Sequence, residues 1–107
     1  MRPGIGTLRQ LTLFETLSAD RLAGLNEAGD LQRLGPDEPL FSRGERLKEL
    51  HIVIAGFVAL THGEPGRDEV TTDVVGPPSP LCLPATLLGL PAPVGSRTVT
   101  SARHVLL

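Results

Sequence analysis

With 107 residues, 40% of them hydrophobic and 21% charged, the sequence is long enough for one domain and too apolar for a disordered segment. It has no run of about 18 apolar residues and no basic-then-apolar start, so we expect no membrane span and no secretory signal, and a cytoplasmic protein. Its net charge of −2, single lysine and lack of Tyr and Trp argue against nucleic-acid binding by this segment, and its one cysteine excludes an internal disulfide.

The first 29 residues are predicted to form two helices. Between Thr7 and Leu17, apolar residues recur mostly at steps of three and four, the spacing of one face of a short helix. That face would carry Leu8, Leu11, Leu13, Phe14 and Leu17. Ser18 is placed to cap a second helix, and Gly29 is placed to end it in a left-handed conformation. The buried face of the second helix would carry Leu22, Leu25 and Ala28.

From Asp30 onward, the apolar residues follow a period of two, which is typical of β-strands. The alternation is clear over 50–55, 57–61 and 70–75. Glycines separate these stretches at intervals of nine to twelve residues, as in a small antiparallel barrel or sandwich. These glycines are Gly35, Gly44, Gly56, Gly66 and Gly76.

A proline-rich segment over 76–95 interrupts the strand pattern. Because proline lacks the N–H group that a sheet ladder needs, we expect a loop, a helical turn at 85–88, a second loop and a last strand from about Ser96. Such an insertion in a barrel is a common place for a ligand site. The final residues, Val105-Leu106-Leu107, are apolar, and we expect that the sequence stops in mid-strand and is truncated there.

Three runs of the sequence read LFETLS at 13–18, PLFSRGE at 39–45 and LHIVIAGFVAL at 50–60, and GRDE follows at 66–69. Their order and spacing resemble those of the cyclic-nucleotide-binding-like sensor domain of the Crp/Fnr transcription regulators. The resemblance implies a mainly β fold, a double-stranded β-helix or jelly-roll-like β-roll with short N-terminal helices and a helical turn in the binding cassette. It divides the sequence into a helical segment, 1–29, and a β-roll, 30–107, truncated at its C-terminus.

The same resemblance implies partners. A small-molecule effector would bind the β-roll, the full-length protein would be a homodimer, and a helix-turn-helix domain absent from these residues would bind DNA.

The start of the cassette departs from the nucleotide-binding pattern of this family. Nucleotide-binding members carry Gly-Glu there, and the glutamate accepts a hydrogen bond from the ribose. Here the two positions read Cys82-Leu83, and a leucine cannot accept a hydrogen bond. The run 81–85 is more similar to the version in relatives that do not use cyclic nucleotides. We therefore expect an effector other than cyclic AMP.

The end of the cassette is ambiguous. In the family, an arginine near this point neutralises the cyclic phosphate. Aligning Thr98-Val99 with the family's Thr-Val puts Gly95 at the arginine position, whereas a shift of two residues puts Arg97 there. The candidate ligand-binding residues are therefore Cys82, Leu83, Pro84, Ala85, Ser96, Arg97 and Thr98.

Other hypotheses stay open. The domain is alternatively a genuine cyclic-nucleotide-binding domain or a ligand-free dimerisation scaffold. The sequence assigns no cofactor with certainty. Two candidates are haem, with Cys82 as a ligand, and a cyclic nucleotide. The histidines at 51, 62 and 104 lack a metal-ligand spacing and are interpreted as residues packed in the barrel wall. An enzyme is not expected. A cupin-type metal site needs two closely spaced histidines and a glutamate, and His51 has no histidine two residues away.

Overall fold

The computed structural model describes residues 1–64 and 67–107; Gly66, one of the predicted turn glycines, lies outside this part. The helices are α1 (Ile5–Arg9), the 3-10 turn η1 (Thr12–Phe14), α2 (Ala19–Ala28) and α3 (Leu83–Leu88). The strands are β1 (Asp30–Leu34), β2 (Pro39–Phe41), β3 (His51–Ala55), β4 (Val58–His62), β5 (Val70–Val75), β6 (Ser79–Leu81), β7 (Gly95–Thr98) and β8 (Ala102–Leu106).

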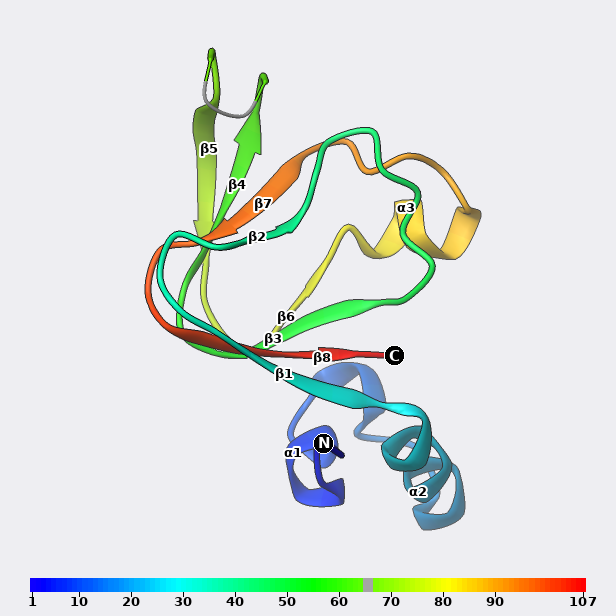
Figure 1. The fold of residues 1–107 in the computed structure, drawn as a ribbon. Coiled ribbons are helices and arrows are strands. Elements are labelled where there is room, and N and C mark those ends of the chain that lie inside the picture. Colours follow the sequence, from blue (N-terminus) through cyan, green and yellow to red (C-terminus); the bar gives the residue numbers. More distant parts are fainter. Residues whose placement is uncertain (65–66) are drawn as a thin grey trace.

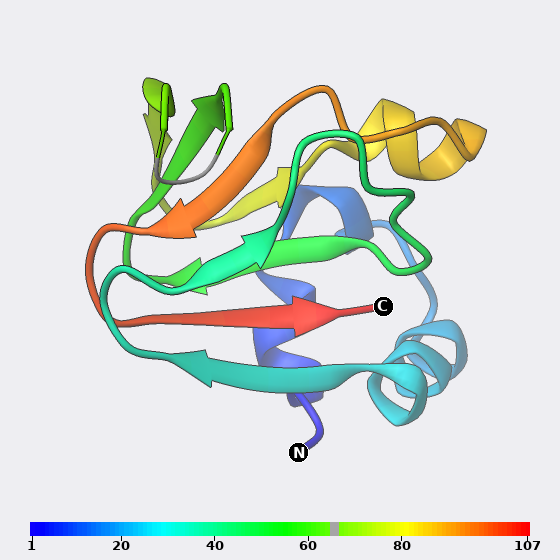
Figure 2. The same ribbon diagram turned by 45° about the horizontal axis from the view of Figure 1, so that its top comes forward.

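The strands form two four-stranded sheets, in the orders β1-β8-β3-β6 and β2-β7-β4-β5. Every pairing within them is antiparallel. The sheets face each other and lie closest where the chain passes from one to the other, and α3 lies beside the opposite, wider end (Figures 1 and 2). This confirms the predicted mainly β, jelly-roll-like β-roll, and the two sheets remain open rather than closing into a barrel.

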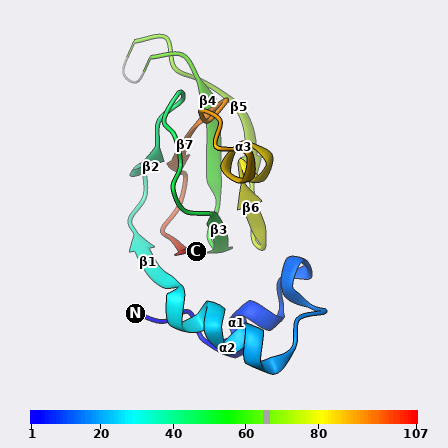
Figure 3. The same cartoon turned by 90° about the vertical axis from the view of Figure 1, so that its right-hand side faces the viewer.

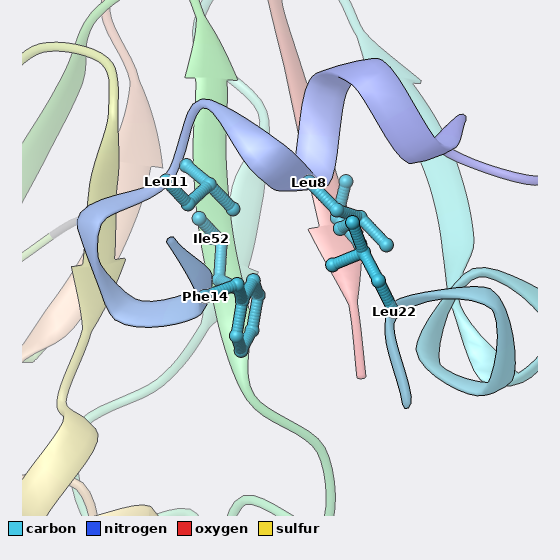
Figure 4. Packing of buried hydrophobic residues seen from close by; sticks show 6 residues of the cluster. Leu8, Leu11, Phe14, Leu22 and Ile52 are labelled. Atoms are coloured by element: carbon cyan, nitrogen blue, oxygen red, sulfur yellow. The ribbon is translucent and has the colours of Figure 1, made fainter. Parts of the chain in front are cut away.

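The N-terminal helices cover the outer face of the first sheet (Figure 3). Leu8, Leu11 and Phe14 are buried there, together with Leu22 of α2. Figure 4 shows Leu11 and Phe14 beside Ile52 of β3, and Leu8 facing Leu22 next to β8. Because alternate residues of a strand point to opposite faces, Ile52 and Val105 serve this outer core, whereas their neighbours point into the roll.

The helical segment differs in detail from the prediction. The single helix expected over 7–17 is broken into α1 and η1, because Leu11 adopts an extended conformation with φ −80° and ψ 125°. As predicted, the Ser18 hydroxyl caps α2 by accepting a hydrogen bond from the backbone N–H of Arg21 at 3.3 Å. Ala28, predicted to be buried, is exposed.

Gly29 ends α2, but the predicted left-handed conformation is wrong. Its φ of −79° and ψ of 152° are extended and open to any residue. A Cβ atom there would lie 3.0 Å from Cδ2 of Leu107 and 3.1 Å from the carbonyl oxygen of Leu25. Glycine suits this position because the chain ends of α2 and β8 approach closely.

A second apolar core fills the roll between the two sheets. It contains Phe41, Leu47, Val53, Val58, Leu81 and Ala92. The three clearest alternating stretches of the sequence are confirmed as β3, β4 and β5. The single last strand predicted from Ser96 is instead two strands, because the chain crosses from the second sheet to the first over residues 99–101. Along the described residues, no helix has the length and apolar character needed to cross a membrane.

Candidate functional site

The proline-rich segment forms β6, α3 and the loop that leads to β7. Its turn is at Cys82, which adopts a left-handed conformation with φ 51° and ψ 40° between β6 and α3. Few residues other than glycine, asparagine and aspartate adopt this conformation readily. The carbonyl of Cys82 accepts hydrogen bonds from both the backbone N–H and the hydroxyl of Thr86, each at 3.0 Å. These bonds hold α3 against the end of β6.

Backbone hydrogen bonds join the loop after α3 to the β2–β3 loop. Ala92 donates to the carbonyl of Glu45 and accepts from the N–H of Gly44, both at 2.8 Å. The Arg46 guanidinium also donates to the carbonyl of Gly89. The two loops therefore close the wide end of the roll together, and α3 cannot move without breaking these bonds.

The first group of predicted site residues lies at this closed end. Ala85 is buried, Cys82 and Leu83 are half-buried, and Pro84 is exposed in the first turn of α3. Cys82 packs against the core inside the roll. Burial raises the pKa of its thiol, and the partly opposing hydrogen bond from the Val94 backbone does not offset this. A thiol that stays protonated is a weak nucleophile and a weak metal ligand.

The second group, on β7, alternates between two faces. Ser96 pairs in register with Phe41, which belongs to the inner core, and with Leu60, which packs against that core. Ser96 therefore faces the inside of the roll. Thr98 is buried, and its hydroxyl accepts from the N–H of Glu38 at 2.8 Å and donates to the carbonyl of Gly35 at 2.7 Å.

Arg97 points to the opposite, outer face of the second sheet. Its guanidinium lies 3.3 Å from the carboxylate of Asp37 and 3.5 Å from that of Glu69, and it donates to the Asp37 carbonyl at 3.0 Å. Two carboxylates therefore already compensate its charge. Alternation places the side chains of Ser96 and Thr98 on the face turned away from it.

Two of the predicted residues are poorly suited to binding a polar ligand on their own. The side chain of Leu83 cannot accept a hydrogen bond, and Arg97 is engaged by Asp37 and Glu69 on the outer face. The hollow beside Ser96 and Arg97 has a volume of only about 20 Å³, close to the space of one water molecule. The structure thus brings the seven predicted residues into two groups, a turn at the wide end and a strand of the second sheet.

Sequence reasoning missed a polar cluster inside the roll. The rings of His51 and His104 are stacked, with centroids 5.4 Å apart, and Phe41 lies edge-on to His51 at 5.1 Å. Within the described residues, three buried polar atoms have no hydrogen-bond partner: Nδ1 of His51, Nδ1 of His104 and Oγ of Ser96. The period of two in 102–106 indicates that His104 points inward. The pairing of β3 with β8, which brings the two histidines together, has no local signal in the sequence.

Burial favours the neutral form of both histidines. Burial lowers the pKa of His51, and Glu45 opposes this only partly. Burial also lowers the pKa of His104 to about 4, with a further contribution from His51. A neutral imidazole with a free Nδ1 can donate or accept one more hydrogen bond. No group of three His, Cys, Asp or Glu side chains suited to a metal ion occurs over 1–64 and 67–107.

Comparison with protein families and with curated proteins finds no match. Comparison with solved structures finds transcription regulators and cyclic-nucleotide-binding-like proteins whose folds are similar to that of this chain. The fold is that of a cyclic-nucleotide-binding-like domain. The N-terminal domain of a transcriptional regulator from Streptomyces coelicolor is 25% identical, with a TM-score of 0.78 over 94% of this chain and 72% of that one.

Two further structures show how widely this cyclic-nucleotide-binding-like fold is used. The regulatory domain of Toxoplasma gondii PKA, solved with cAMP, is 24% identical, with a TM-score of 0.81 over 96% of this chain and 39% of that one. The Thermus thermophilus catabolite activator protein is 20% identical, with a TM-score of 0.72 over 89% of this chain. The present chain spans 45% of the length of that activator. These neighbours are regulatory domains rather than enzymes.

Proposed function

We propose that this chain is the effector-sensing domain of a transcription regulator and that its effector is a small molecule other than a cyclic nucleotide. The observation that carries the proposal is the combination of Leu83 at the acid position with Arg97 held by two carboxylates. The fold, shared with regulators and with a cAMP-binding domain, supports the sensing role. We further propose that the chain is not catalytic and acts in the cytoplasm.

The inner polar cluster supports a polar effector. Leaving a buried polar atom unpaired costs about 1–3 kcal/mol, and the roll contains three such atoms on His51, His104 and Ser96. A ligand with hydrogen-bonding groups would recover part of that cost. Entry requires the loop after α3 and the β2–β3 loop to separate, because backbone hydrogen bonds between Ala92 and both Gly44 and Glu45 close the wide end of the roll. We propose that this opening transmits the effector signal to a homodimer partner and to a DNA-binding domain, neither of which is among these residues.

Thermal unfolding in the presence of candidate ligands tests the proposal, because a ligand that binds only the folded state raises the Tm. Cyclic AMP and cyclic GMP at millimolar concentration are expected to leave the Tm unchanged. Two other probes serve as the comparison. Binding of a polar metabolite such as 2-oxoglutarate is read from the Tm, and binding of haem is read from a Soret band. A rise in Tm with either nucleotide, absent in an Arg97→Gln variant, would overturn the assignment of a non-nucleotide effector.

A second candidate function is a ligand-free dimerisation scaffold. The small volume of the hollow beside Ser96 and Arg97 favours it, since a binding site for an organic molecule usually has a volume of a few hundred Å³. Backbone amide NMR spectra distinguish the two functions. A sensor is expected to show ligand-dependent shifts around Cys82 and Ser96 in a screen of polar metabolites. A scaffold shows none and instead shows concentration-dependent shifts on its surface.

A further inference from the structure

A separate groove lies outside the roll, between the N-terminal helical segment and the first sheet. One part of it is a cavity of about 500 Å³, within the range of sites for small organic ligands. The floor is apolar, because Leu11 and Ile52 are 4% and 1% exposed. Figure 4 shows these two side chains close together beside β6. The lining residues are Leu11, Thr12, Ile52, Pro78 and Pro80.

The groove continues along the sheet toward a basic end. A neighbouring hollow of about 330 Å³ shares Leu11 and Pro78 with the first and extends to Arg103 on β8. A third hollow, of about 390 Å³, shares Arg103 and extends to Arg33 on β1. Ala55, which pairs in register with Arg103, is three residues beyond Ile52 on β3. At the rise of a strand, this places Arg103 about 10 Å along the sheet from the apolar floor, and Arg33 lies one strand further across.

Arg33 and Arg103 are direct register partners on β1 and β8. Like charges placed opposite each other on adjacent strands destabilise a sheet. Both side chains are exposed, and neither takes part in an ion pair or a side-chain hydrogen bond with any described residue. An anion between them would relieve the repulsion, because two guanidinium groups present forked N–H donors that match a carboxylate or a phosphate.

We propose that this groove binds a small amphiphile with one anionic head group. The head, a carboxylate or a phosphate, lies between Arg33 and Arg103, and the hydrocarbon body covers Leu11 and Ile52. The site is distinct from the proposed effector site inside the roll, because Ile52 points outward whereas His51 and Val53 on the same strand point inward. It therefore stands whether or not the roll binds an effector.

Isothermal titration calorimetry with decanoate and decyl phosphate, below their aggregation concentrations, tests the proposal. Both probes are expected to bind, and their ratio identifies the preferred head group. Decanol, which has the same body without a charge, is expected to bind about tenfold more weakly or worse, because a hydrogen bond to a charged group is among the stronger polar interactions. Butyrate, which has the head without the body, is expected not to bind measurably. Equal affinity for decanol and decanoate would overturn the proposal.

Variants locate the site. Arg103→Gln and Arg33→Gln are each expected to weaken decanoate binding about tenfold or more. Thr12→Glu, at an exposed position beside the apolar part, is expected to abolish binding, because the hydrocarbon body of the probe would desolvate the new carboxylate. Arg21→Gln is the matched control, since this exposed arginine on α2 does not line the groove.

Two outcomes contradict the site. Unchanged affinity in both arginine variants would place the probe elsewhere. The second outcome is that neither amphiphile binds, that the chain self-associates, and that Thr12→Glu abolishes this self-association. The groove would then be an interface between two copies of the chain. Far-ultraviolet circular dichroism of each variant confirms that a lost affinity does not reflect unfolding.

Discussion

The imidazole rings of His51 and His104 stack across β3 and β8, with their planes 5° from parallel and their centroids 5.4 Å apart. Both rings point into the roll, and both Nδ1 atoms are buried without a partner among the described residues. A proton on one ring would be poorly solvated and would repel a proton on the other. The stacked pair is therefore a feature of the neutral state.

The first prediction concerns stability at mildly acidic pH. The pKa of His104 is lowered from 6.5 to about 4 by burial, so between these values the unfolded chain binds a proton that the folded chain does not. The free energy of unfolding is fully retained above pH 6.5 and falls as the pH drops toward 4. The loss from this residue is about 3 kcal/mol. Urea unfolding at a series of pH values across this window measures it.

Two variants assign this pH dependence. His104→Phe keeps an aromatic ring in place and is expected to remove most of the loss. His62→Gln changes an exposed histidine and is expected to leave it unchanged. Asp30 contributes separately, because the hydrogen bond from the N-terminal amine lowers the pKa of its carboxyl below 3.8, so its stabilisation is lost only at lower pH. An identical pH profile in His104→Phe and the parent chain would refute the role of the pair.

The second prediction compares two turn glycines with the same backbone conformation. Gly56 has φ 82°, and a Cβ atom there would lie 2.2 Å from the carbonyl oxygen of Ser101. Gly44 has φ 87°, and a Cβ atom there would meet open space. Gly56→Ala is expected to cost about 3–5 kcal/mol of unfolding free energy, from strain and a backbone clash together. Gly44→Ala is expected to cost about 1–2 kcal/mol, from backbone strain alone. Denaturant unfolding of both variants checks the difference, and equal costs would contradict it.

The local parts of this fold could be predicted from the sequence. Alternation of apolar residues identified β3, β4 and β5, and the Ser18 cap was correct, because each depends on neighbours within a few residues. The predicted conformation of Gly29 was wrong because glycine suits this position for another reason, the close approach of Leu107 from a distant part of the chain. The break at Leu11 was missed for a similar reason, since packing against β3 overrides the helical period.

The candidate site was less predictable than the fold. The chemistry of Leu83 could be read directly, because it depends only on residue type. The ion pairs of Arg97 could not, because Asp37 and Glu69 are 60 and 28 positions away in the chain. The stacked histidines and the facing arginines on β1 and β8 likewise depend on which strands pair, which a single sequence does not specify.

The third prediction concerns backbone strain at the start of α3. Cys82 has φ 51°, a left-handed conformation that costs a residue with a Cβ atom about 1–2 kcal/mol relative to glycine. Cys82→Ala and Cys82→Gly both remove the thiol and differ only in that Cβ atom. Cys82→Gly is therefore expected to be the more stable of the two by about 1 kcal/mol. Thermal unfolding of the pair measures this difference. If Cys82→Ala were the more stable, the left-handed turn would not be a source of strain.

The last prediction separates two hydroxyl groups two residues apart on β7. Ser96 is 2% exposed and its Oγ has no partner within the described residues, whereas the Thr98 hydroxyl is hydrogen-bonded at both its donor and acceptor sites. Ser96→Ala is expected to change the unfolding free energy by less than about 0.5 kcal/mol or to raise it, because it removes a polar group that is already unpaired. Thr98→Val keeps the shape but leaves the Glu38 N–H and the Gly35 carbonyl without their partner, and is expected to cost about 1–3 kcal/mol. Urea unfolding of both variants measures the contrast. A large loss in Ser96→Ala would mean that a bound water or ligand satisfies Ser96 in solution, and it would direct the search for the effector to that hydroxyl.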